Sequence, residues 1–539
     1  MRKTTWLGGL LAAGLAMMGA GVAAAAPGDG PVPATGDLVI HKFIGAPIAG
    51  ERTGEAIDTS GWTGVTAANG VVFDLYQVGP PVAVAPPGEA WADVPPQGEY
   101  LRNATTKNLE VYDGTTLIGE YALTDAATPR LTTASDGTAT ASALPQGLYL
   151  AVENAAASTT ITDASTGQEL YISQVAAPFV VAVPMTTPDG TGWLDVVHVY
   201  PKNEALTVGK TVDAAGAIAV GDTVTYTITV SVPSDIADSK KFAITDPLNA
   251  ALDLTLASVT VDTLPALTPS LVKDTDYTIA YDPATHVLAV TFDDTGRAKL
   301  AAAGSVVVTL GTTVNASVLS APGMSVTNTA HVDFTNASDV DFEANSGGGD
   351  GEDVPAMIHT AAISVTKVDA SGAALNGATF KIASSSANAK AGTFLRIDPD
   401  TKVVYDVDPA DDSAWTKLGS ANDYAINPAN VASFTGLRDQ VVVNGAPVWQ
   451  TYWVAETAAP ASYNLLAEPI AVSFADAFAG FADPADYDHV ASLTVKNSKG
   501  FLLPQTGGAG TVLLTVAGVV LIGSAVLVGA SRKKKTATV

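Results

Sequence analysis

Hydrophobic and polar residues alternate along much of the chain, and the clearest case lies near its middle. In DTVTYTITVSVP, apolar side chains occupy every second position from Val224 to Val230, and mostly threonines fill the positions between them. This period of two is that of a β-strand with one buried face. The runs VLAVTFDD and SVVVTLGTTV, from Val287 and Ser305, are further strand candidates. Glycine and proline separate such runs, so the pattern predicts an all-β chain of β-sandwich domains.

Two stretches of the chain repeat one plan and predict two related domains. Each opens on a lysine-bearing strand, HKFIG or TKVDASG, and continues through an Asn-Gly turn into NGVVFDLYQV or NGATFKIAS. Each then has a strand with tyrosine four residues before glutamate, YLAVEN or YWVAET, and closes on a Lys-Asn pair. The stretch between them is built differently. We therefore predict three tandem domains, at 27–203, 204–358 and 359–500.

The first of these domains also contains VGPPVAVAPPGEAWADVPPQGEY, with three Pro-Pro pairs. Proline cannot donate to the hydrogen-bond ladder of a central strand. This segment is therefore predicted to be an exposed loop.

The two ends of the chain carry signals for export and anchoring. Residues 1–26 have two basic residues, an apolar run and an alanine-rich stretch, which is the layout of a secretory signal peptide. Within residues 501–539, the uncharged and largely apolar run 511–530 is long enough to form a transmembrane helix. Four basic residues follow at 532–535, which favours a cytoplasmic end and disfavours the alternative of a buried core helix.

Composition excludes several classes of function. The net charge of −27 opposes binding of nucleic acid. The absence of cysteine excludes disulfides, thiolate catalysis and Cys-based zinc sites, so any covalent reinforcement must use other side chains. No Gly-rich phosphate loop or GxSxG motif is present, which disfavours a secreted hydrolase and predicts a structural protein rather than an enzyme.

No metal site or cofactor is predicted. The histidines show no HxxxH or HExxH spacing, and most of them are expected at the surface: His41, His198, His286, His331, His359 and His489. The acidic stretch DPDTKVVYDVDPADD could bind calcium but does not match the spacing of an EF-hand loop.

Candidate chemistry comes from polar residues that occupy the apolar phase of their strands. In the third domain, Lys367, Asn497 and Glu456 each follow apolar residues at spacings of two, so all three should point into the core. Burial favours a neutral amine and a protonated acid. A neutral amine beside an amide carbon is a nucleophile beside an electrophile, so this set predicts a Lys–Asn isopeptide bond with ammonia leaving.

The same test succeeds in the other two domains. The middle domain offers Lys210, Asn328 and the acid Asp246, and the first offers Lys42 and Asn203. The first domain's acid is expected to be Glu153, although Leu150 and Val152 on the same strand have the opposite phase. For any one set, a hydrogen-bonded polar cluster or a lysine that snorkels to the surface is an alternative. Three sets in one cysteine-free chain favour cross-links.

One strand end places an amide and an amine on opposite sides. In WLDVVHVYPKN, continued alternation sends Asn203 to the side of Val197 and Val199, which is the core side. The neighbouring Lys202 should then face outward.

These residues also carry a family resemblance. The chain resembles the shaft, or backbone, pilins of sortase-assembled pili in Gram-positive bacteria. Its WLDVVHVYPK matches that family's pilin motif, WxxxVxVYPK, through Trp193, Val197, Val199, Tyr200, Pro201 and Lys202. YWVAETAAPASY resembles the family's E-box, and LPQTG (Leu503, Pro504, Gln505, Thr506, Gly507) resembles its cell-wall sorting motif.

This sequence departs from the family in two places. Ser462 stands where the E-box commonly has glycine, and ENAAAST in the first domain lacks the rest of an E-box, which weakens the assignment of Glu153.

The resemblance implies immunoglobulin-like domains of the collagen-adhesin A and B types and a covalently polymerised surface pilus. A pilin-specific sortase would cleave between Thr506 and Gly507, and Lys202 of another subunit would take up the acyl group. Further implied partners are a housekeeping sortase, peptidoglycan, identical subunits and a tip adhesin pilin, with a role in adhesion and biofilm formation through an unidentified receptor. The alternative is a monomeric wall-anchored adhesin in which Lys202 is never used.

Overall fold

The computed structural model describes the chain at 32–45, 53–83, 94, 98–125, 130–158, 160–213, 217–347, 356–398, 400–405, 424–425, 431–443, 446–479 and 488–500. The predicted signal peptide, the LPQTG motif and the apolar run 511–530 lie outside these residues. In the described part of the chain, no helix has the length and apolar character needed to cross a membrane.

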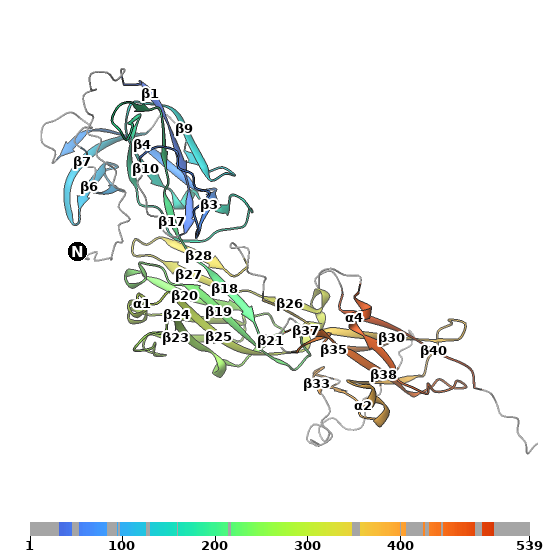
Figure 1. The fold of residues 1–539 in the computed structure, drawn as a ribbon. Coiled ribbons are helices and arrows are strands. Elements are labelled where there is room, and N and C mark those ends of the chain that lie inside the picture. Colours follow the sequence, from blue (N-terminus) through green and yellow to red (C-terminus); the bar gives the residue numbers. More distant parts are fainter. Residues whose placement is uncertain are drawn as a thin grey trace, which may run out of the picture.

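Figure 1 shows three β-rich bodies that follow one another along an elongated molecule, with the middle body (green and yellow) between the other two. We call β1 to β17 the N-terminal body, β18 to β29 the middle body and β30 to β40 the C-terminal body. The predicted all-β fold is confirmed.

The N-terminal body pairs a sheet of order β13-β10-β4-β7-β6-β5 with smaller sheets of order β16-β1-β9 and β11-β3-β2-β17-β12. Its elements are β1 (Thr35–His41), β2 (Phe43–Gly45), β3 (Val65–Asn69), β4 (Val72–Ala83), β5 (Glu99–Arg102), β6 (Leu109–Asp113), β7 (Thr116–Asp125), β8 (Leu131–Thr132), β9 (Thr138–Pro145), β10 (Gly147–Glu153), η1 (Ala155–Ala157), β11 (Thr162–Asp163), β12 (Ile172–Gln174), β13 (Phe179–Val183), β14 (Met185–Thr186), β15 (Trp193–Leu194), β16 (Val196–Val199) and β17 (Lys202–Ala205).

The middle body is a sandwich of the sheets β18-β19-β25-β21 and β23-β24-β20-β27-β28, with the pair β26-β29 beside them. Its elements are β18 (Val208–Val212), β19 (Thr223–Ser231), η2 (Ile236–Asp238), β20 (Lys241–Pro247), β21 (Leu252–Leu254), η3 (Leu256–Ser258), β22 (Thr260–Leu264), β23 (Tyr277–Asp282), β24 (Val287–Phe292), α1 (Asp294–Leu300), β25 (Ser305–Val314), η4 (Ala316–Ser320), η5 (Pro322–Met324), β26 (Ser325–Asn328), β27 (His331–Thr335), β28 (Asp341–Asn345) and β29 (Ala356–His359).

The C-terminal body packs the sheet β35-β30-β40 against the sheet β34-β31-β38-β39. Its elements are β30 (Ala361–Asp369), β31 (Thr379–Ala383), α2 (Ser386–Ala391), β32 (Arg396–Ile397), β33 (Val404–Tyr405), β34 (Tyr424–Ala425), β35 (Val431–Leu437), β36 (Gln440–Val443), β37 (Ala446–Trp449), β38 (Thr451–Ala458), β39 (Ile470–Ser473), α4 (Phe474–Ala477) and β40 (Val490–Asn497).

The predicted alternation is confirmed in β19, where Val224, Tyr226, Ile228 and Val230 are buried and the residues between them are partly exposed. The expectation of a loop throughout the proline-rich segment is wrong at its start. Pro80 and Pro81 lie in β4, and Pro81 pairs with Tyr121 of β7. The register shifts on both sides of Pro81. A bulged pairing of this kind tolerates prolines that a regular ladder would exclude.

The two predicted Asn-Gly turns both contain a glycine in the left-handed region, with φ of 84° at Gly70 and 89° at Gly377. Their surroundings differ. A Cβ atom at Gly70 would lie 2.2 Å from the carbonyl oxygen of Thr160, whereas a Cβ atom at Gly377 would have no heavy atom within 4 Å. The first turn therefore depends on glycine for space as well as for conformation.

Substitution of these two glycines by alanine should separate the two effects. Gly377→Ala should cost about 1 kcal/mol, because only the left-handed conformation is penalised. Gly70→Ala should cost about 1–3 kcal/mol more, because the backbone must also move away from Thr160. Amide hydrogen exchange of β31 and β4 would measure the local unfolding free energies, and equal losses at the two turns would contradict the steric argument.

Candidate functional site

The N-terminal body brings together the three side chains that the sequence singled out. Lys42 lies between β1 and β2, Asn203 lies on β17, and Glu153 ends β10 in the large sheet. The Lys42 amine donates to Glu153 Oε2 at 2.8 Å and also to Asn203 Oδ1. The Asn203 amide donates to Glu153 Oε1 at 2.6 Å, and Ala176 N donates to Glu153 Oε2 at 3.1 Å. All three side chains are buried, so amine, amide and acid form one cluster inside the core.

The C-terminal body has a similar cluster, in which the lysine amine contacts backbone carbonyl oxygens. The Asn497 amide donates to both oxygens of Glu456, at 2.8 and 2.9 Å, and Leu466 N donates to Glu456 Oε2 at 2.9 Å. The Lys367 amine is fully buried and lies 3.3 Å from the carbonyl oxygens of Val368 and Val495.

One strand register positions the lysine and the asparagine in both of these bodies. β17 runs parallel to β2 with Asn203 opposite Ile44, which is two residues after Lys42. β40 runs parallel to β30 with Asn497 opposite Asp369, which is two residues after Lys367. Residues two apart on a strand point to the same face. The lysine and the asparagine therefore share the inner face of adjacent strands, and the acid reaches them from the opposing sheet.

The middle body forms a related cluster from strands that are paired differently. Lys210 on β18 donates to Asp246 Oδ2 at 2.5 Å, and Asp246 lies on β20 in the opposing sheet. Asn328 comes from β26, which pairs with β29 rather than with β18. Its amide is buried without a hydrogen bond of ordinary geometry, as is Asp246 Oδ1. Burial raises the pKa of the Asp246 carboxyl, and Asn328 lies close enough to oppose this rise.

Burial has the expected effect on the amines. It lowers the pKa of Lys42 and of Lys367 against the opposing attraction of Glu153 and Glu456, respectively. It lowers the pKa of Lys210 to about 8. Burial also raises the pKa of Asp246, although the nearby Lys210 opposes this shift. A lysine with a lowered pKa is more often neutral, and only the neutral amine is a nucleophile.

The amine of the pilin-motif lysine lies beside two aromatic rings from outside the motif. Val197 and Asn203 are buried, whereas Lys202 at the start of β17 is partly exposed. The Lys202 Nζ atom lies 4.2 Å from the centroid of the Trp62 ring and 5.9 Å from that of Phe43, distances typical of cation–π contacts.

The remaining motif residues form the strand end that carries this lysine. Trp193 and Val199 are partly buried in β15 and β16, and Pro201 separates β16 from β17. Tyr200 is buried as well, and its hydroxyl accepts a hydrogen bond from Ile57 N at 2.7 Å. The sorting motif at 503–507 lies outside the described residues.

The expectation that most histidines lie at the surface is wrong for two of them. His359 and His489 are buried and contact the buried Asp439. The other four are partly buried. No spacing in the sequence pointed to this cluster, because its members are 80 and 50 residues apart and meet only through the packing of separate elements.

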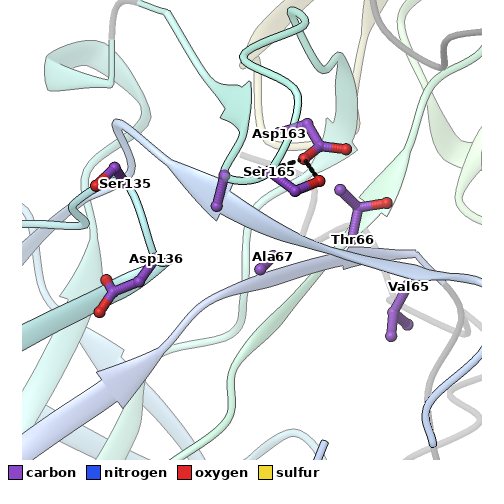
Figure 2. Close-up of a pocket in the computed structure, with 8 residues that line it drawn as sticks. Val65, Thr66, Ala67, Ser135, Asp136, Asp163 and Ser165 are labelled. Carbon is purple, nitrogen blue, oxygen red and sulfur yellow. Dashed lines mark hydrogen bonds between the residues drawn. The ribbon is translucent and has the colours of Figure 1, made fainter. Parts of the chain in front are cut away.

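A pocket of about 370 Å³ lies elsewhere on the N-terminal body, beside β3 (Figure 2). Its lining includes Asp136 and Asp163, whose carboxylates accept hydrogen bonds from Thr138 and Ser165 in their own turns. None of its lining residues belongs to the lysine, acid and asparagine clusters.

Comparisons with known proteins agree with this architecture. Residues 33–204 match the model of the Gram-positive pilin subunit D1 N-terminal domain, 361–480 match a prealbumin-like fold domain, and 495–537 match the LPXTG cell wall anchor motif.

Two curated relatives are fimbrial subunits. The type 1 subunit of Actinomyces viscosus is 29% identical over 413 residues, which cover 69% of this chain and 74% of the relative. The type 2 subunit of Actinomyces naeslundii is 30% identical over 293 residues, or 51% of this chain and 48% of the relative. Among solved structures, the full-length major pilin SpaD of Corynebacterium diphtheriae is 22% identical with a TM-score of 0.48, covering 87% of this chain and 98% of that one.

A tandem of β-sandwich bodies with a pilin N-terminal domain and a wall-anchor motif defines a class of surface-anchored structural proteins. The chain has a Gram-positive pilin domain and an LPXTG cell wall anchor motif, and it is similar to fimbrial subunits. The predicted resemblance to the shaft pilins of Gram-positive bacteria is confirmed.

The pKa of Lys210 generates a test of the middle cluster. In an Asn328→Ala variant, Lys210 has no amide partner and remains a titratable amine. Its folded pKa of about 8 lies below its unfolded value of about 10.4, so the unfolded state binds more protons between these pH values. The free energy of unfolding should therefore rise from pH 8 to pH 10.5, by up to about 3 kcal/mol.

The double variant Asn328→Ala/Lys210→Met is the matched control, because it keeps every other titrating group. Denaturant unfolding of both variants across this pH range gives the difference due to Lys210. A difference that stays constant with pH would show that the buried amine is not shifted.

Proposed function

We propose that this pilin is the shaft subunit of a covalent pilus and is polymerised through Lys202 and Thr506. A sortase would cleave between Thr506 and Gly507 and hold the Thr506 carbonyl as an acyl-enzyme. The neutral Lys202 amine of another subunit would attack that carbonyl. A C–N bond forms, the bond to the enzyme breaks, and the enzyme group leaves with the proton.

The observation that carries this proposal is that two adjacent residues differ in burial. Asn203 is buried against Lys42 and Glu153, whereas the adjacent Lys202 is partly exposed at the end of the pilin motif. A partly exposed amine at the start of a paired strand can reach an enzyme-bound acyl group without unfolding of the body that carries it.

We further propose that each body closes an internal Lys–Asn isopeptide bond, joining Lys42 to Asn203, Lys210 to Asn328 and Lys367 to Asn497. The lysine nitrogen attacks the amide carbon, the carbon–nitrogen bond of the amide breaks, and ammonia leaves. Glu153, Asp246 and Glu456 would polarise the amide and relay the proton. The domains would then correspond to 27–203, 204–358 and 359–500, with a signal peptide at 1–26 and a sorting signal at 501–539.

In this proposal the chain is a substrate and not an enzyme. Its partners would be a pilin-specific sortase, identical subunits, a tip adhesin pilin, and a housekeeping sortase that joins the polymer to peptidoglycan. The run 511–530 would hold the precursor in the membrane until cleavage. The LPXTG match and the pilin domain support a surface pilus anchored to the cell wall. A monomeric wall-anchored adhesin would share these motifs but would leave Lys202 unused.

Replacement of Lys202 tests polymerisation. Lys202→Ala should abolish the detergent-resistant ladder of high mass on immunoblots of boiled cell-wall extracts, because the nucleophile is lost. Lys202→Arg should fail as well, since guanidinium stays protonated.

The matched control is Lys496→Ala, which removes the exposed lysine of the other Lys-Asn pair. It should leave the ladder unchanged. A ladder from either Lys202 variant would show that another lysine is the nucleophile, whereas a single band from the wild-type chain would favour the monomeric adhesin.

Replacement of the acids tests the internal bonds. Glu456→Ala and Asp246→Ala should each retain one ammonia that the wild-type chain loses, after correction for the substitution, because the amide is no longer polarised. Intact-mass measurement of the chain counts these losses. As a control, Asp222→Ala removes a carboxylate that pairs with Arg438 outside the clusters, and it should keep the wild-type deficit. An unchanged deficit in the Glu456 or Asp246 variant would remove that acid from the mechanism.

A further inference from the structure

Three side chains of metal-ligand type meet where the middle and C-terminal bodies join. His359 Nε2 lies 3.0 Å from Asp439 Oδ1, and His489 Nδ1 lies 3.1 Å from Asp439 Oδ2. The two imidazole rings are stacked with centroids 4.1 Å apart. The exposed fractions of His359, Asp439 and His489 are 4%, 0% and 2%. The cluster is therefore enclosed by protein and formed by three separate segments.

The backbone holds each of these segments in place. His359 ends β29, and its carbonyl oxygen accepts from Ile218 N of the middle body at 2.9 Å. His489 precedes β40, and its carbonyl oxygen accepts from Ala362 N at 2.9 Å. Asp439 follows β35, and its carbonyl oxygen accepts from Gln450 N at 2.7 Å. Such anchoring fixes the donor atoms before any ligand arrives.

The local charge favours a cation. Asp439 lies between the two imidazoles, and each of its carboxylate oxygens is within hydrogen-bond distance of a different ring. The neighbouring Arg438 pairs with Asp222 across the joint, with contacts of 2.7 and 2.5 Å. Burying a carboxylate without a compensating positive charge or hydrogen-bond donor is costly, and a bound cation would supply that compensation.

We propose that His359, Asp439 and His489 bind a divalent transition-metal ion of the zinc class at this joint. Their donor atoms all lie within 4.8 Å of one another. In a tetrahedral zinc site with ligand bonds of 2.0–2.2 Å, neighbouring donor atoms are about 3.4 Å apart. The two nitrogen–oxygen contacts are already near this value. Each neutral imidazole would bind through the nitrogen that faces Asp439 and keep its proton on the other nitrogen, while Asp439 supplies one negative charge.

The donor set selects the class of ion. Calcium and magnesium prefer oxygen ligands, whereas imidazole nitrogen suits zinc and its neighbours. The chain has no cysteine, so histidine and carboxylate are the donors available for such an ion. A bound ion would tie the end of β29 to the segments before β36 and β40. It would thereby oppose separation of the two bodies.

Zinc binding tests this proposal on the full-length chain, purified in detergent and treated with a chelator. Titration calorimetry with zinc chloride should show one saturable site per chain, and zinc should raise the melting temperature of the C-terminal body. Cobalt(II) should give the visible absorption of a low-symmetry, near-tetrahedral site. Calcium chloride should do neither.

His489→Asn and His286→Asn form a matched pair of variants. Both histidines have positive φ, 54° and 58°, a conformation that asparagine tolerates. His286 lies between β23 and β24 of the middle body, and its ring contacts Tyr281 rather than Asp439. His489→Asn should weaken zinc binding at least about tenfold, since loss of even a supporting group commonly costs that much. His286→Asn should bind as the wild type does.

Two results would overturn the proposal. One is the absence of saturable zinc or cobalt binding by the wild-type chain, which would leave the cluster as a hydrogen-bonded polar contact. The other is unchanged affinity in His489→Asn, which would place the ion at a surface site. The wild-type titration and its reversal by chelator decide the matter even if the His489 variant fails to fold.

Discussion

The burial of a lysine amine inside each β-sandwich is the constraint on which the rest of this structure depends. An unpaired ammonium in a protein core is costly, so the fold must supply a partner or neutralise the amine. Each body supplies a carboxyl group from the opposing sheet and an asparagine from another strand. Lys42 therefore links its acid and its asparagine through hydrogen bonds, Lys210 contacts Asp246, and Lys367 is held by backbone carbonyl oxygens. The proposed amide bonds would remove the titratable charge from each core altogether.

The strand order decides what such a bond would resist. In the N-terminal and C-terminal bodies the lysine and the asparagine lie on parallel neighbours, β2 with β17 and β30 with β40. Each pair joins an early strand of its body to its last strand. Tension on Lys202 would enter β17 one residue from Asn203, so the proposed bond would take up the load before the strand could peel from its sheet. The middle body lacks this parallel pairing and draws Asn328 from a strand beside the sandwich.

Much of this arrangement follows from the period of two along the chain. The phases of Lys367, Glu456 and Asn497 predicted their placement, because one face of those strands is apolar. The uncertainty at Glu153 has a physical cause. Leu150 on the same strand packs in a second small core with Val78, Leu109 and Tyr121. Both faces of β10 are therefore buried, and alternation no longer marks an inner side. The cluster at Asp439 could not be predicted, because no local pattern encodes contacts between bodies.

One departure from the family pattern, at Ser462, has a consequence for the backbone conformation. Ser462, which replaces the usual glycine, has a φ of 72°. That region penalises a side chain, so the serine is strained where glycine would not be. Two backbone hydrogen bonds hold this turn in place. Gly500 N donates to the carbonyl oxygen of Ser462, and Asn464 N donates to the carbonyl oxygen of Ser498. These contacts fix the segment after Glu456 against the end of β40. The acid and Asn497 thus stay aligned although the residue that would most easily make this turn is absent.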